Sequence, residues 1–508
     1  MPKQKRKDDS DSEDVLTTIK KKKAGQNGSH SVEEEAVGDN ENQPVFCTGQ
    51  PASTPFTDVS DEEEVVKDNN IVNKCNDFSG EVLVCGGMNW DLVGRHKVPK
   101  NVKNGGGPNL WQPHRIGSFQ GIKVSNVVSG CGACHSVVIT EDGKAYSFGR
   151  NDKGQLGQGD MGRRRDAPTL LESLNNIRIV DGACGKNHTL LLSDTGRVFS
   201  FGDNKMGQLG LGHQTATVPS PTEVHIGEKY PDRGPIKKVA CGGEFTMMIT
   251  AKGTLYSFGL PEYGQLGHNT DGKYFVTSNK LSYNCEMTPR PVKCFFEVKE
   301  SRYINMPDVS ITDVACGTNH TIAIDHKKRV FSWGFGGYGR LGHSEQKDEM
   351  VPRLIKLFDG GYARGAVMCS AGSTFSLVVS DPGRILYLFG QNKPTGEAAM
   401  YPKVVTDVGG WNIRSIGCCN KSIVVVADSS VISWGPSPTY GELGYGEHKP
   451  KSSTRAEVMK SMEGMHIHKV ACGYGHCILI AKCDTDEEKA DVDKQKVFTP
   501  NPVTEATA

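Results

Sequence analysis

The chain has 508 residues, enough for more than one domain, and its formal net charge is zero. Its sixty glycines show no collagen-like period and are typical of many short strands joined by tight turns. No apolar run approaches the roughly 18 residues of a membrane-spanning helix. No secretory signal precedes the sixteen cysteines, so we expect a reduced intracellular protein rather than a disulfide scaffold.

The charges are unevenly distributed along the chain. Residues 1–75 have a net charge of −6 and residues 482–508 of −3, which leaves +9 on residues 76–481. A basic body with acidic tails suits anionic partners such as nucleic acid, acidic protein surfaces or tubulin tails. An ordinary solvated surface with a modest excess of lysine explains the same numbers.

Residues 1–75 have the composition of a disordered tail, with charge blocks and few large apolar residues. Two basic clusters stand twelve residues apart, at Lys5, Arg6 and Lys7 and at Lys20, Lys21, Lys22 and Lys23. Their spacing suits a bipartite nuclear import signal. A basic arm that touches nucleic acid and a merely solubilising tail are the alternatives.

Both tails contain candidate phosphorylation sites. Ser10 and Ser12 lie in an acidic run, and Thr54 and Thr499 each precede a proline. Phosphate added beside the basic clusters would change the local charge. We expect residues 482–508 to form a second disordered, acidic tail.

A string containing Phe-Gly or Trp-Gly and ending in Leu-Gly recurs at residues 147–157, 200–210, 257–267 and 332–342. A second string, containing Cys-Gly, precedes each copy, at residues 131–135, 183–188, 240–245 and 315–320. Self-similarity at a fixed period indicates a repeat architecture in which each unit buries its apolar face on its neighbours.

The repeat unit has the pattern of short β-strands. Residues 197–201 and 329–333 alternate with a period of two, and residues 189–192 and 321–324 are apolar runs of buried strands. Each unit of about 50 residues therefore predicts four antiparallel strands. Radial repetition of such sheets is a β-propeller, so we expect an all-β fold.

The number of units predicts the number of blades. Six aligned glycines mark six units, at Gly149, Gly202, Gly259, Gly334, Gly390 and Gly435. Residues 471–476 form the first half of another unit, and its second half stands at residues 81–94. We therefore predict a seven-bladed propeller over residues 76–481, closed by N-terminal and C-terminal strands that share one blade.

Several longer strings go beyond the generic repeat, at residues 89–95, 261–269, 334–343, 346–354 and 432–438. On these strings and the repeats, residues 80–482 resemble the RCC-type repeat propellers, in a branch distinct from the Ran exchange factor. The resemblance implies binding of Rac- and Ral-type small GTPases, microtubules, chromatin, centromeres and chromosomal passenger proteins. It also implies a nuclear and nucleolar protein that moves in mitosis to chromosomes, the spindle midzone and the midbody, with some cytoskeletal or cytoplasmic pool.

The largest irregularity lies between Gly259 and Gly334, which are 75 residues apart against 53 to 57 for the preceding gaps. The excess falls at residues 270–310. Its candidate GTPase-binding residues are Glu297, Val298, Lys299, Glu300, Ser301, Arg302 and Tyr303. Loops carry specificity on a rigid scaffold, and in the resembled family a segment here is tied to Rac binding. A neutral surface insertion is the alternative.

One slot of the repeat holds His135, His188, His320 and His476. Because other units place Phe or Ser there, we expect these histidines to bond neighbouring loops and order the blades rather than hold a metal. The preceding positions are the better surface candidates for the propeller rim: Asn187, Glu244, Asn319 and Lys421.

Two loops form a candidate basic patch for phosphate or an acidic tail, with a solvated face as the alternative: Arg95, Lys97, Lys100, Lys103, Arg163, Arg164 and Arg165. The zinc-like spacings at residues 131–135 and 472–477 coincide with repeat slots, which indicates core positions. The GxGxxG at residues 334–339 is a repeat turn, since no helix follows it. We expect no metal and no cofactor.

The sequence contains no nucleophile–base pair, metal constellation or phosphate cradle, so an enzyme is the weakest hypothesis. The leading hypothesis is a monomeric, non-catalytic scaffold that regulates a Rac- or Ral-type GTPase and acts in mitosis. Whether it would exchange nucleotide or mask the GTPase stays open. A chromatin adaptor without GTPase activity is the alternative.

Overall fold

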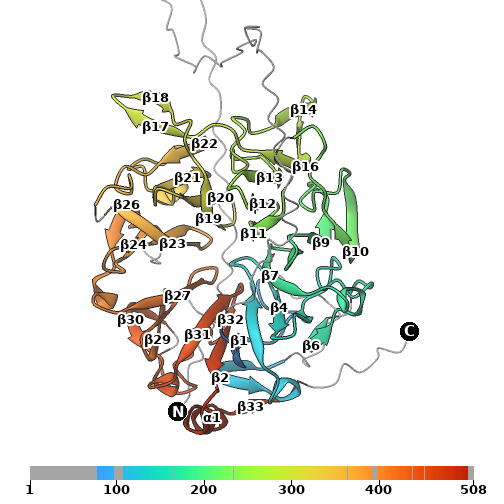
Figure 1. The fold of residues 1–508 in the computed structure, drawn as a ribbon, viewed down its shortest axis with the longest axis vertical. Coiled ribbons are helices and arrows are strands. Elements are labelled where there is room, and N and C mark those ends of the chain that lie inside the picture. The colour runs from blue at the N-terminus through green and yellow to red at the C-terminus, as the bar shows by residue number, and fades with distance from the viewer. Residues whose placement is uncertain are drawn as a thin grey trace, which may run out of the picture. The chain divides into compact units, whose positions relative to one another are not determined.

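A computed structural model describes residues 77–95, 107–162, 164–230, 232, 234–362, 364–391, 397–436, 439–450 and 452–500. The nuclear import clusters, Ser10, Ser12 and Thr54 lie outside these residues, as do Lys97, Lys100, Lys103 and Arg163. Within them the fold is an almost all-β propeller, which confirms the predicted fold class at that level (Figure 1). No helix of the described residues is long and apolar enough to cross a bilayer.

Four sheets have four antiparallel strands each. They are β10 (Thr215–Glu223), β9 (Val198–Asn204), β8 (His188–Ser193) and β7 (Ile179–Cys184); β11 (Ile236–Cys241), β12 (Phe245–Thr250), β13 (Leu255–Gly259) and β16 (Glu286–Pro291); β23 (Gly365–Ala371), β24 (Phe375–Asp381), β25 (Leu386–Gly390) and β26 (Ala399–Val404); and β27 (Ile413–Cys418), β28 (Ile423–Ala427), β29 (Ser430–Gly435) and β30 (Ser453–Val458).

A fifth sheet has six strands, in the order β18 (Arg302–Asn305), β17 (Phe296–Lys299), β22 (Glu349–Leu354), β21 (Val330–Gly334), β20 (His320–Asp325) and β19 (Ile311–Cys316). Strands β14 (Lys273–Thr277) and β15 (Lys280–Tyr283) form a separate two-stranded sheet. Short 3-10 helices connect other strands at Gly117–Phe119, Glu172–Leu174, Gly337–Gly339, Thr406–Val408 and Lys460–Met462.

The largest sheet joins the two ends of the propeller in nine strands. Its order is β31 (Ile467–Cys472), β32 (His476–Lys482), β1 (Gly80–Gly87), β3 (Val124–Val128), β4 (His135–Thr140), β5 (Ala145–Gly149) and β6 (Arg165–Leu170), with β2 (Asn109–Ile116) on β1 and β33 (Val497–Phe498) on β2. Strand β1 pairs with β32 from Gly80 opposite Lys482 to Gly86 opposite His476. Strands from both ends of the propeller thus share hydrogen bonds.

The prediction of seven separate blades was wrong. Five blades stand as separate sheets, four of them four-stranded and one extended to six strands by the β17–β18 hairpin. The strands expected to form the first and last blades lie in one nine-stranded sheet, because Gly80 of β1 also pairs with Val124 of β3. A repeat count cannot detect such a bridging pair.

The prediction of a disordered tail over residues 482–508 was also wrong for its first part. A helix, α1 (Asp486–Asp493), begins at a capping box in which the Thr485 side chain accepts from the Glu488 backbone and Glu488 reaches back to Thr485. Strand β33 then pairs in parallel with β2. Arg115 of β2 forms an ion pair with Asp493 at 2.6 Å, and this pair ties the helix to the sheet.

The innermost strands form the wall of a central channel. Strand β3 contacts both β7 and β31, and contacts continue from β7 through β11, β19, β23 and β27 back to β31. Figure 1 shows β7, β11, β19, β23, β27 and β31 around the middle of the propeller. Apolar side chains between neighbouring sheets form the core, including the fully buried Phe201, Phe258 and Phe389.

The recurring strings build the turns of this scaffold. The Ser200 hydroxyl donates to the Leu209 carbonyl at 2.9 Å and closes the loop after the strand. Gly202 has a φ of +115°, and an added Cβ there would lie 2.4 Å from the backbone oxygen of Asn187. Only glycine allows this positive φ together with this close approach. The repeats are therefore structural, as the sequence indicated.

Candidate functional site

The insertion between β13 and β19 builds two hairpins on one side of the propeller. Its third strand, β16, completes the blade by pairing with β13. The β14–β15 hairpin is a sheet of its own, whereas β17 pairs in parallel with β22 at Phe296 and Arg353. The predicted binding loop at residues 297–303 is therefore a β-hairpin on the outer edge of the six-stranded sheet (Figure 1).

The tip of the β17–β18 hairpin is a two-residue turn with unusual backbone geometry. Lys299 pairs with Arg302, and Glu300 and Ser301 between them have φ values of 49° and 63°. Two successive positive φ values are those of a type I′ turn, which asparagine and glycine normally occupy. Non-glycine residues in this region are strained, and such strain clusters at functional sites.

The tip presents charges of both signs. Lys299 and Arg302 are exposed, and Lys299 forms an ion pair with Glu297 at 2.8 Å. Val298 and Tyr303 are half-buried opposite each other. This arrangement offers a narrow, charged edge with an apolar centre to a partner.

The base of this hairpin is rigidly anchored. The Tyr303 hydroxyl donates to Glu349 Oε2 at 3.1 Å, and Arg353 contacts the same carboxylate at 2.6 Å. Burial and the neighbouring carboxylate of Glu349 raise the pKa of Tyr303 to about 12, so the hydroxyl stays a donor at neutral pH. Next to the hairpin, Phe295 packs edge-on against Phe331 in the core. The contacts to Glu349 thus fix the base of the hairpin, whereas Lys299 and Arg302 at the tip are exposed.

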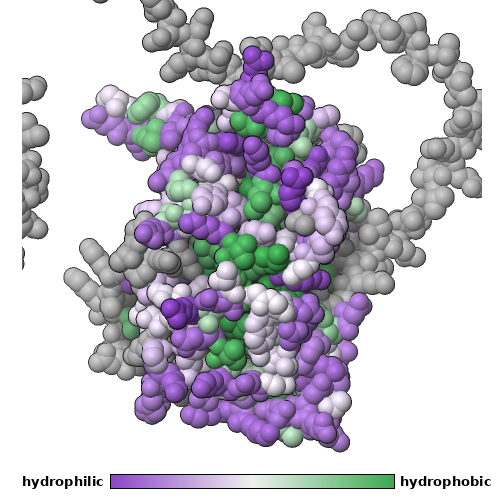
Figure 2. All heavy atoms as spheres, turned by 90° about the vertical axis from the view of Figure 1, so that its left-hand side faces the viewer, coloured by the Kyte–Doolittle hydropathy of each residue, from purple (hydrophilic) through white to green (hydrophobic). Residues whose placement is uncertain are grey.

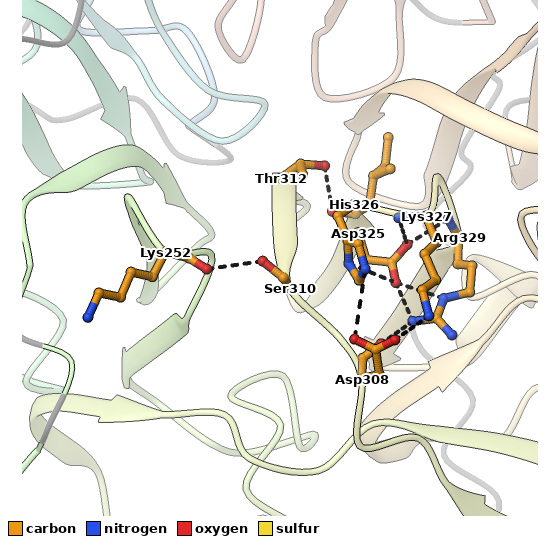
Figure 3. A network of polar contacts seen from close by, with 9 residues as sticks. Lys252, Asp308, Ser310, Thr312, Asp325, His326, Lys327 and Arg329 are labelled. Atoms are coloured by element: carbon orange, nitrogen blue, oxygen red, sulfur yellow. Dashed lines mark hydrogen bonds and ion pairs between the residues drawn. The ribbon is translucent and has the colours of Figure 1, made fainter. Parts of the chain in front are cut away.

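The return of the insertion to β19 is held by a polar network, which Figure 3 shows. Asp308 forms an ion pair with Lys327, which lowers the pKa of Asp308, and its backbone oxygen accepts from Arg329. Arg329 Nε donates to the buried Asp325 at 2.7 Å. The Ser310 hydroxyl donates to the backbone of the β12–β13 turn at 3.0 Å. Both ends of the β17–β18 segment are thus fixed to the propeller.

The β14–β15 hairpin is a surface that the sequence analysis missed. It exposes large apolar side chains, most strongly Phe275 at 72%. The Tyr283 hydroxyl anchors it through a hydrogen bond to Glu262 at 2.8 Å, and burial with this carboxylate raises the pKa of Tyr283 to about 12. The run of Tyr-Phe-Val between Asp-Gly and Ser-Asn was the available signal for this hairpin.

The predicted rim residues lie around one end of the channel. Asn187 lines a cavity of about 250 Å³ together with Arg150 and Asn420. Lys186, beside Asn187, is 3.8 Å from Glu244. The backbone oxygens of Asn187, Glu244 and Asn319 each accept, at 2.9 to 3.0 Å, from an amide at the end of the second strand after them: those of Asp203, Leu260 and Phe335. Lys421 is exposed. The first three residues therefore have a structural backbone role, and their side chains are partly accessible.

The four histidines of the repeat link neighbouring units, but through hydroxyl groups on strands rather than through the loops that we expected. Each is fully buried, and each Nε2 contacts a hydroxyl of the next unit: His135 with Thr189 at 2.8 Å, His188 with Thr246 at 3.1 Å, His320 with Ser376 at 2.9 Å and His476 with Ser136 at 2.7 Å. Burial lowers the pKa of His135 to about 3 and that of His188 and His476 to about 4. These rings are neutral at physiological pH.

The described members of the predicted basic patch are all paired with aspartates. Arg95 pairs with Asp152, and Arg165 pairs with Asp160 at 2.8 Å. Arg164 pairs with Asp91 and, at 3.0 Å, with Asp166. These contacts neutralise charge that an anionic partner would need. They favour the solvated-face interpretation for these three residues.

A polar ring inside the channel also escaped the sequence analysis. Lys469 donates to Asn126 at 2.6 Å, Asn126 donates to Asp181 at 2.9 Å, and Lys238 pairs with Asp313. Each residue follows the same backbone irregularity of an innermost strand. Since each ammonium group already has a partner, the ring stabilises the channel wall rather than offering a phosphate site.

The remaining surface beside the six-stranded sheet is mixed. Figure 2 views the propeller from the side of β26 and β30 and shows hydrophilic side chains over most of it, with apolar side chains near the middle. Exposed large apolar residues on the described surface include Tyr362, Tyr401 and Val404. The two hairpins of the insertion remain the most distinctive projections, because one has a strained charged tip and the other exposed aromatic side chains.

Comparison with known proteins agrees with this architecture. Residues 81–479 match the RCC1-like domain. The chain is 53% identical to Protein RCC2 of Mus musculus over 431 residues, covering 84% of this chain and 81% of the relative. It is 49% identical to the Protein RCC2 homolog of Danio rerio over 459 residues, covering 89% and 90%. The structure of Prp20p from Saccharomyces cerevisiae superposes with a TM-score of 0.62 at 19% identity, covering 84% and 96%.

Proposed function

Because the chain belongs to the RCC1-like propeller family, we propose that it is a non-catalytic scaffold that binds and regulates a small GTPase of the Rac or Ral type. The observation that carries the proposal is the β17–β18 hairpin, with its strained, charged tip on an anchored base. A preformed hairpin loses little conformational entropy when it binds.

The chemistry of the hairpin supports contact with a protein surface. Lys299 and Arg302 are exposed on opposite strands, and Glu297 keeps one carboxylate between them and the body of the sheet. The hairpin combines charges of both signs with an aromatic side chain. This combination suits a GTPase surface that also has charges of both signs better than it suits a uniformly anionic polymer such as nucleic acid.

Regulation requires no bond to be made or broken. A propeller that binds the nucleotide-free GTPase more tightly than the loaded form favours nucleotide release through linkage alone. A propeller that binds both forms equally would only mask the surface that other partners use. The two modes differ in their effect on release and agree in their need for the hairpin.

The resemblance to the family adds a cellular setting to this proposal. We place the protein in the nucleus and nucleolus between divisions, with some cytoskeletal or cytoplasmic pool. In mitosis we place it on chromosomes, at the centromere, at the spindle midzone and at the midbody. Microtubules and chromosomal passenger proteins are its proposed partners there. Localisation of a fluorescent fusion through one division tests this setting.

The decisive experiment measures release of a fluorescent nucleotide from Rac, Ral and Ran in the presence of the full chain. The test variant reverses the tip charges with Lys299→Glu and Arg302→Glu, because both side chains are exposed and surface substitutions usually change stability by no more than ~0.5 kcal/mol. A matched control, Lys280→Glu, changes an exposed lysine on the other hairpin. We expect faster release from Rac or Ral, lost only in the test variant.

The outcomes separate the parts of the proposal. Binding without faster release would contradict exchange and leave masking. Binding that survives both the charge reversal and deletion of residues 296–304 would contradict the hairpin assignment. Absence of binding to all three GTPases would contradict the GTPase function.

A chromatin adaptor is the second candidate function. The structure of Prp20p, which shares the fold, is described together with its binding to Gsp1p and histones. Against this candidate, the described arginines of the basic patch are paired with aspartates. Binding to nucleosomes that weakens steeply with rising salt, and does not depend on the hairpin, would favour the adaptor.

A further inference from the structure

Three buried thiols meet where the two ends of the propeller join. Cys472 ends β31, and Cys477, the second residue of β32, lies directly opposite it. Cys419 comes from the turn between β27 and β28 of the neighbouring sheet. The Sγ atom of Cys477 lies 3.5 Å from that of Cys419 and 3.4 Å from that of Cys472, and all three sulfur atoms lie within 4.8 Å of one another.

We propose that Cys419, Cys472 and Cys477 form a binding site for one thiophilic metal ion, Cu(I) or Zn(II). Thiolate ligands select these ions. With a metal–sulfur distance of roughly 2.3 Å, the sulfur atoms of a three- or four-coordinate site lie roughly 3.8 to 4.0 Å apart. The Sγ–Sγ separations of 3.4 and 3.5 Å and the upper limit of 4.8 Å for the cluster lie within about 1 Å of these values, so modest side-chain shifts allow the three thiols to coordinate one ion.

The backbone places the thiols before any ion arrives. The Cys419 amide donates to the Ser422 carbonyl at 2.8 Å, and the Cys477 thiol donates to the Glu442 carbonyl at 3.2 Å. Cys472 and Cys477 are opposite each other on paired strands, so their side chains share a face. A site whose ligands are held by two strands and a tight turn is preorganised.

A fourth thiol lies beside this cluster. Cys85 of β1 is directly opposite Cys477, and its thiol donates to the Glu442 carbonyl at 3.8 Å. It lies outside the set of mutually close sulfur atoms. Three ligands suit Cu(I), whereas recruitment of Cys85 would complete the four ligands that structural Zn(II) prefers. The number of sulfur ligands therefore distinguishes the two ions.

The channel provides a route to the site. Cys472 lines a cavity of about 230 Å³ inside the propeller, together with thiols in the same slot of other innermost strands: Cys184, Cys241, Cys316 and Cys418. Gly417 leaves room for the Cys472 thiol, since an added Cβ would lie 2.5 Å from its sulfur. A thiophilic ion that enters the channel would thus meet sulfur atoms along its wall.

Coordination exchanges protons for the ion. Each thiol that becomes a thiolate ligand releases one proton to solvent, so three protons leave as one ion binds. The resulting site has a charge of −2 with Cu(I) and −1 with Zn(II). Charge therefore favours Zn(II), while the coordination number favours Cu(I), and affinity must rise with pH for either ion.

The test uses the full chain under anaerobic, reducing conditions, after alkylation of the thiols that are accessible in the folded protein, such as the exposed Cys294. Cu(I) and, separately, Zn(II) are titrated against a competing chromogenic chelator, and the metal retained after gel filtration is measured. We expect the wild-type chain to retain one ion more than Cys419→Ser. Loss of a ligand should weaken binding by at least the ~10–100-fold that loss of an outer-shell partner costs.

The matched control is Cys241→Ser, which removes a buried thiol from the same slot of β11 but lies outside the three-thiol cluster. It should bind like the wild type. If Cys419→Ser fails to fold, X-ray absorption of the metal-bound wild-type chain still tests the site. Three or four sulfur ligands around the metal ion would support the proposal. The proposal would be overturned if X-ray absorption found two or fewer sulfur ligands. It would also be overturned if the wild-type chain retained no metal, or no more metal than Cys419→Ser.

Discussion

The Nε2 atom of His476 lies 2.7 Å from the hydroxyl of Ser136, although 340 residues separate the two in the chain. His476 begins β32 and Ser136 lies in β4, so this bond connects the last strand of the propeller to one of its first. Both residues are fully buried, and Trp90 packs edge-on against the imidazole. The same contact recurs between neighbouring sheets, where it links units adjacent in sequence.

We expect His476→Ala to lower the free energy of unfolding by about 3 kcal/mol, because it leaves a cavity and an incompletely bonded hydroxyl. Urea unfolding followed by tryptophan fluorescence measures the change. The exposed His213→Ala is the control and should change stability by less than ~0.5 kcal/mol. Equal effects of the two substitutions would contradict the closing role of His476.

Stability should fall as the pH drops below about 6.5. In the folded chain burial lowers the pKa of His135 to about 3 and that of His188 and His476 to about 4, whereas the unfolded chain binds protons near pH 6.5. Each group therefore stabilises the fold above pH 6.5, and this contribution is lost toward pH 4. From pH 7 to 5.5 the loss is roughly 1 kcal/mol per histidine.

One carboxyl group opposes this trend. Burial raises the pKa of Glu442 to about 8, so it binds its proton more readily in the folded chain and stabilises the fold as the pH falls. Several histidines outweigh a single carboxyl group. Chemical denaturation at a series of pH values between 5 and 8 measures the sum, and a stability that is flat or rises toward pH 5.5 would contradict the buried, neutral histidines.

Tyr303→Phe should loosen the β17–β18 hairpin without unfolding the propeller. The substitution removes the hydrogen bond to Glu349, whose other partner Arg353 remains, and should cost the local structure about 1 kcal/mol. Limited trypsin digestion, followed by mass spectrometry, should show faster cleavage after Lys299 and Arg302. Cleavage after Lys280 on the other hairpin serves as the internal control, and an equal rise there would contradict local anchoring.

Phe275→Ser should leave stability within ~0.5 kcal/mol of the wild type, because the side chain is 72% exposed. Phe258→Ser, which changes a fully buried ring of β13 in the neighbouring four-stranded sheet, should lower it by roughly 3–5 kcal/mol. Thermal unfolding compares the two. Static light scattering should show weaker self-association for Phe275→Ser, since large exposed apolar side chains promote association. Equal scattering from Phe275→Ser and the wild type would contradict a role of the β14–β15 hairpin in self-association.

Much of the scaffold could be predicted from the sequence. The Ser-Phe-Gly strings predicted strands that end in tight turns, and Gly202 adopts the positive φ that such a turn requires. Histidines in one slot predicted bonds that order the blades, and His188 makes such a bond to Thr246, although on a strand of the next unit and not on the expected loop. These features are local or repeat at a fixed spacing, so a single sequence displays them.

The candidate site was predicted only in part. The length of the insertion pointed to residues 297–303, but not to the strand pairing that anchors them on β22. From the sequence, Arg164 and Arg165 were predicted to belong to a basic patch. The structure pairs them with Asp91 and Asp160, and the sequence does not show these contacts. The folded segment with α1 was missed since its acidic composition is also that of a disordered tail.

The sequence alone determined that this chain is a propeller of RCC-type repeats, because the same pattern of strands and turns recurs in each repeat unit. Only the tertiary structure decided which units merge. The pair of Gly80 with Val124 joins strands from both ends into one sheet, and Cys419 meets Cys472 and Cys477 across two sheets. Such contacts depend on how the closed ring brings distant residues together. A local pattern of polarity or turn residues does not show which residues far apart in the sequence will make contact.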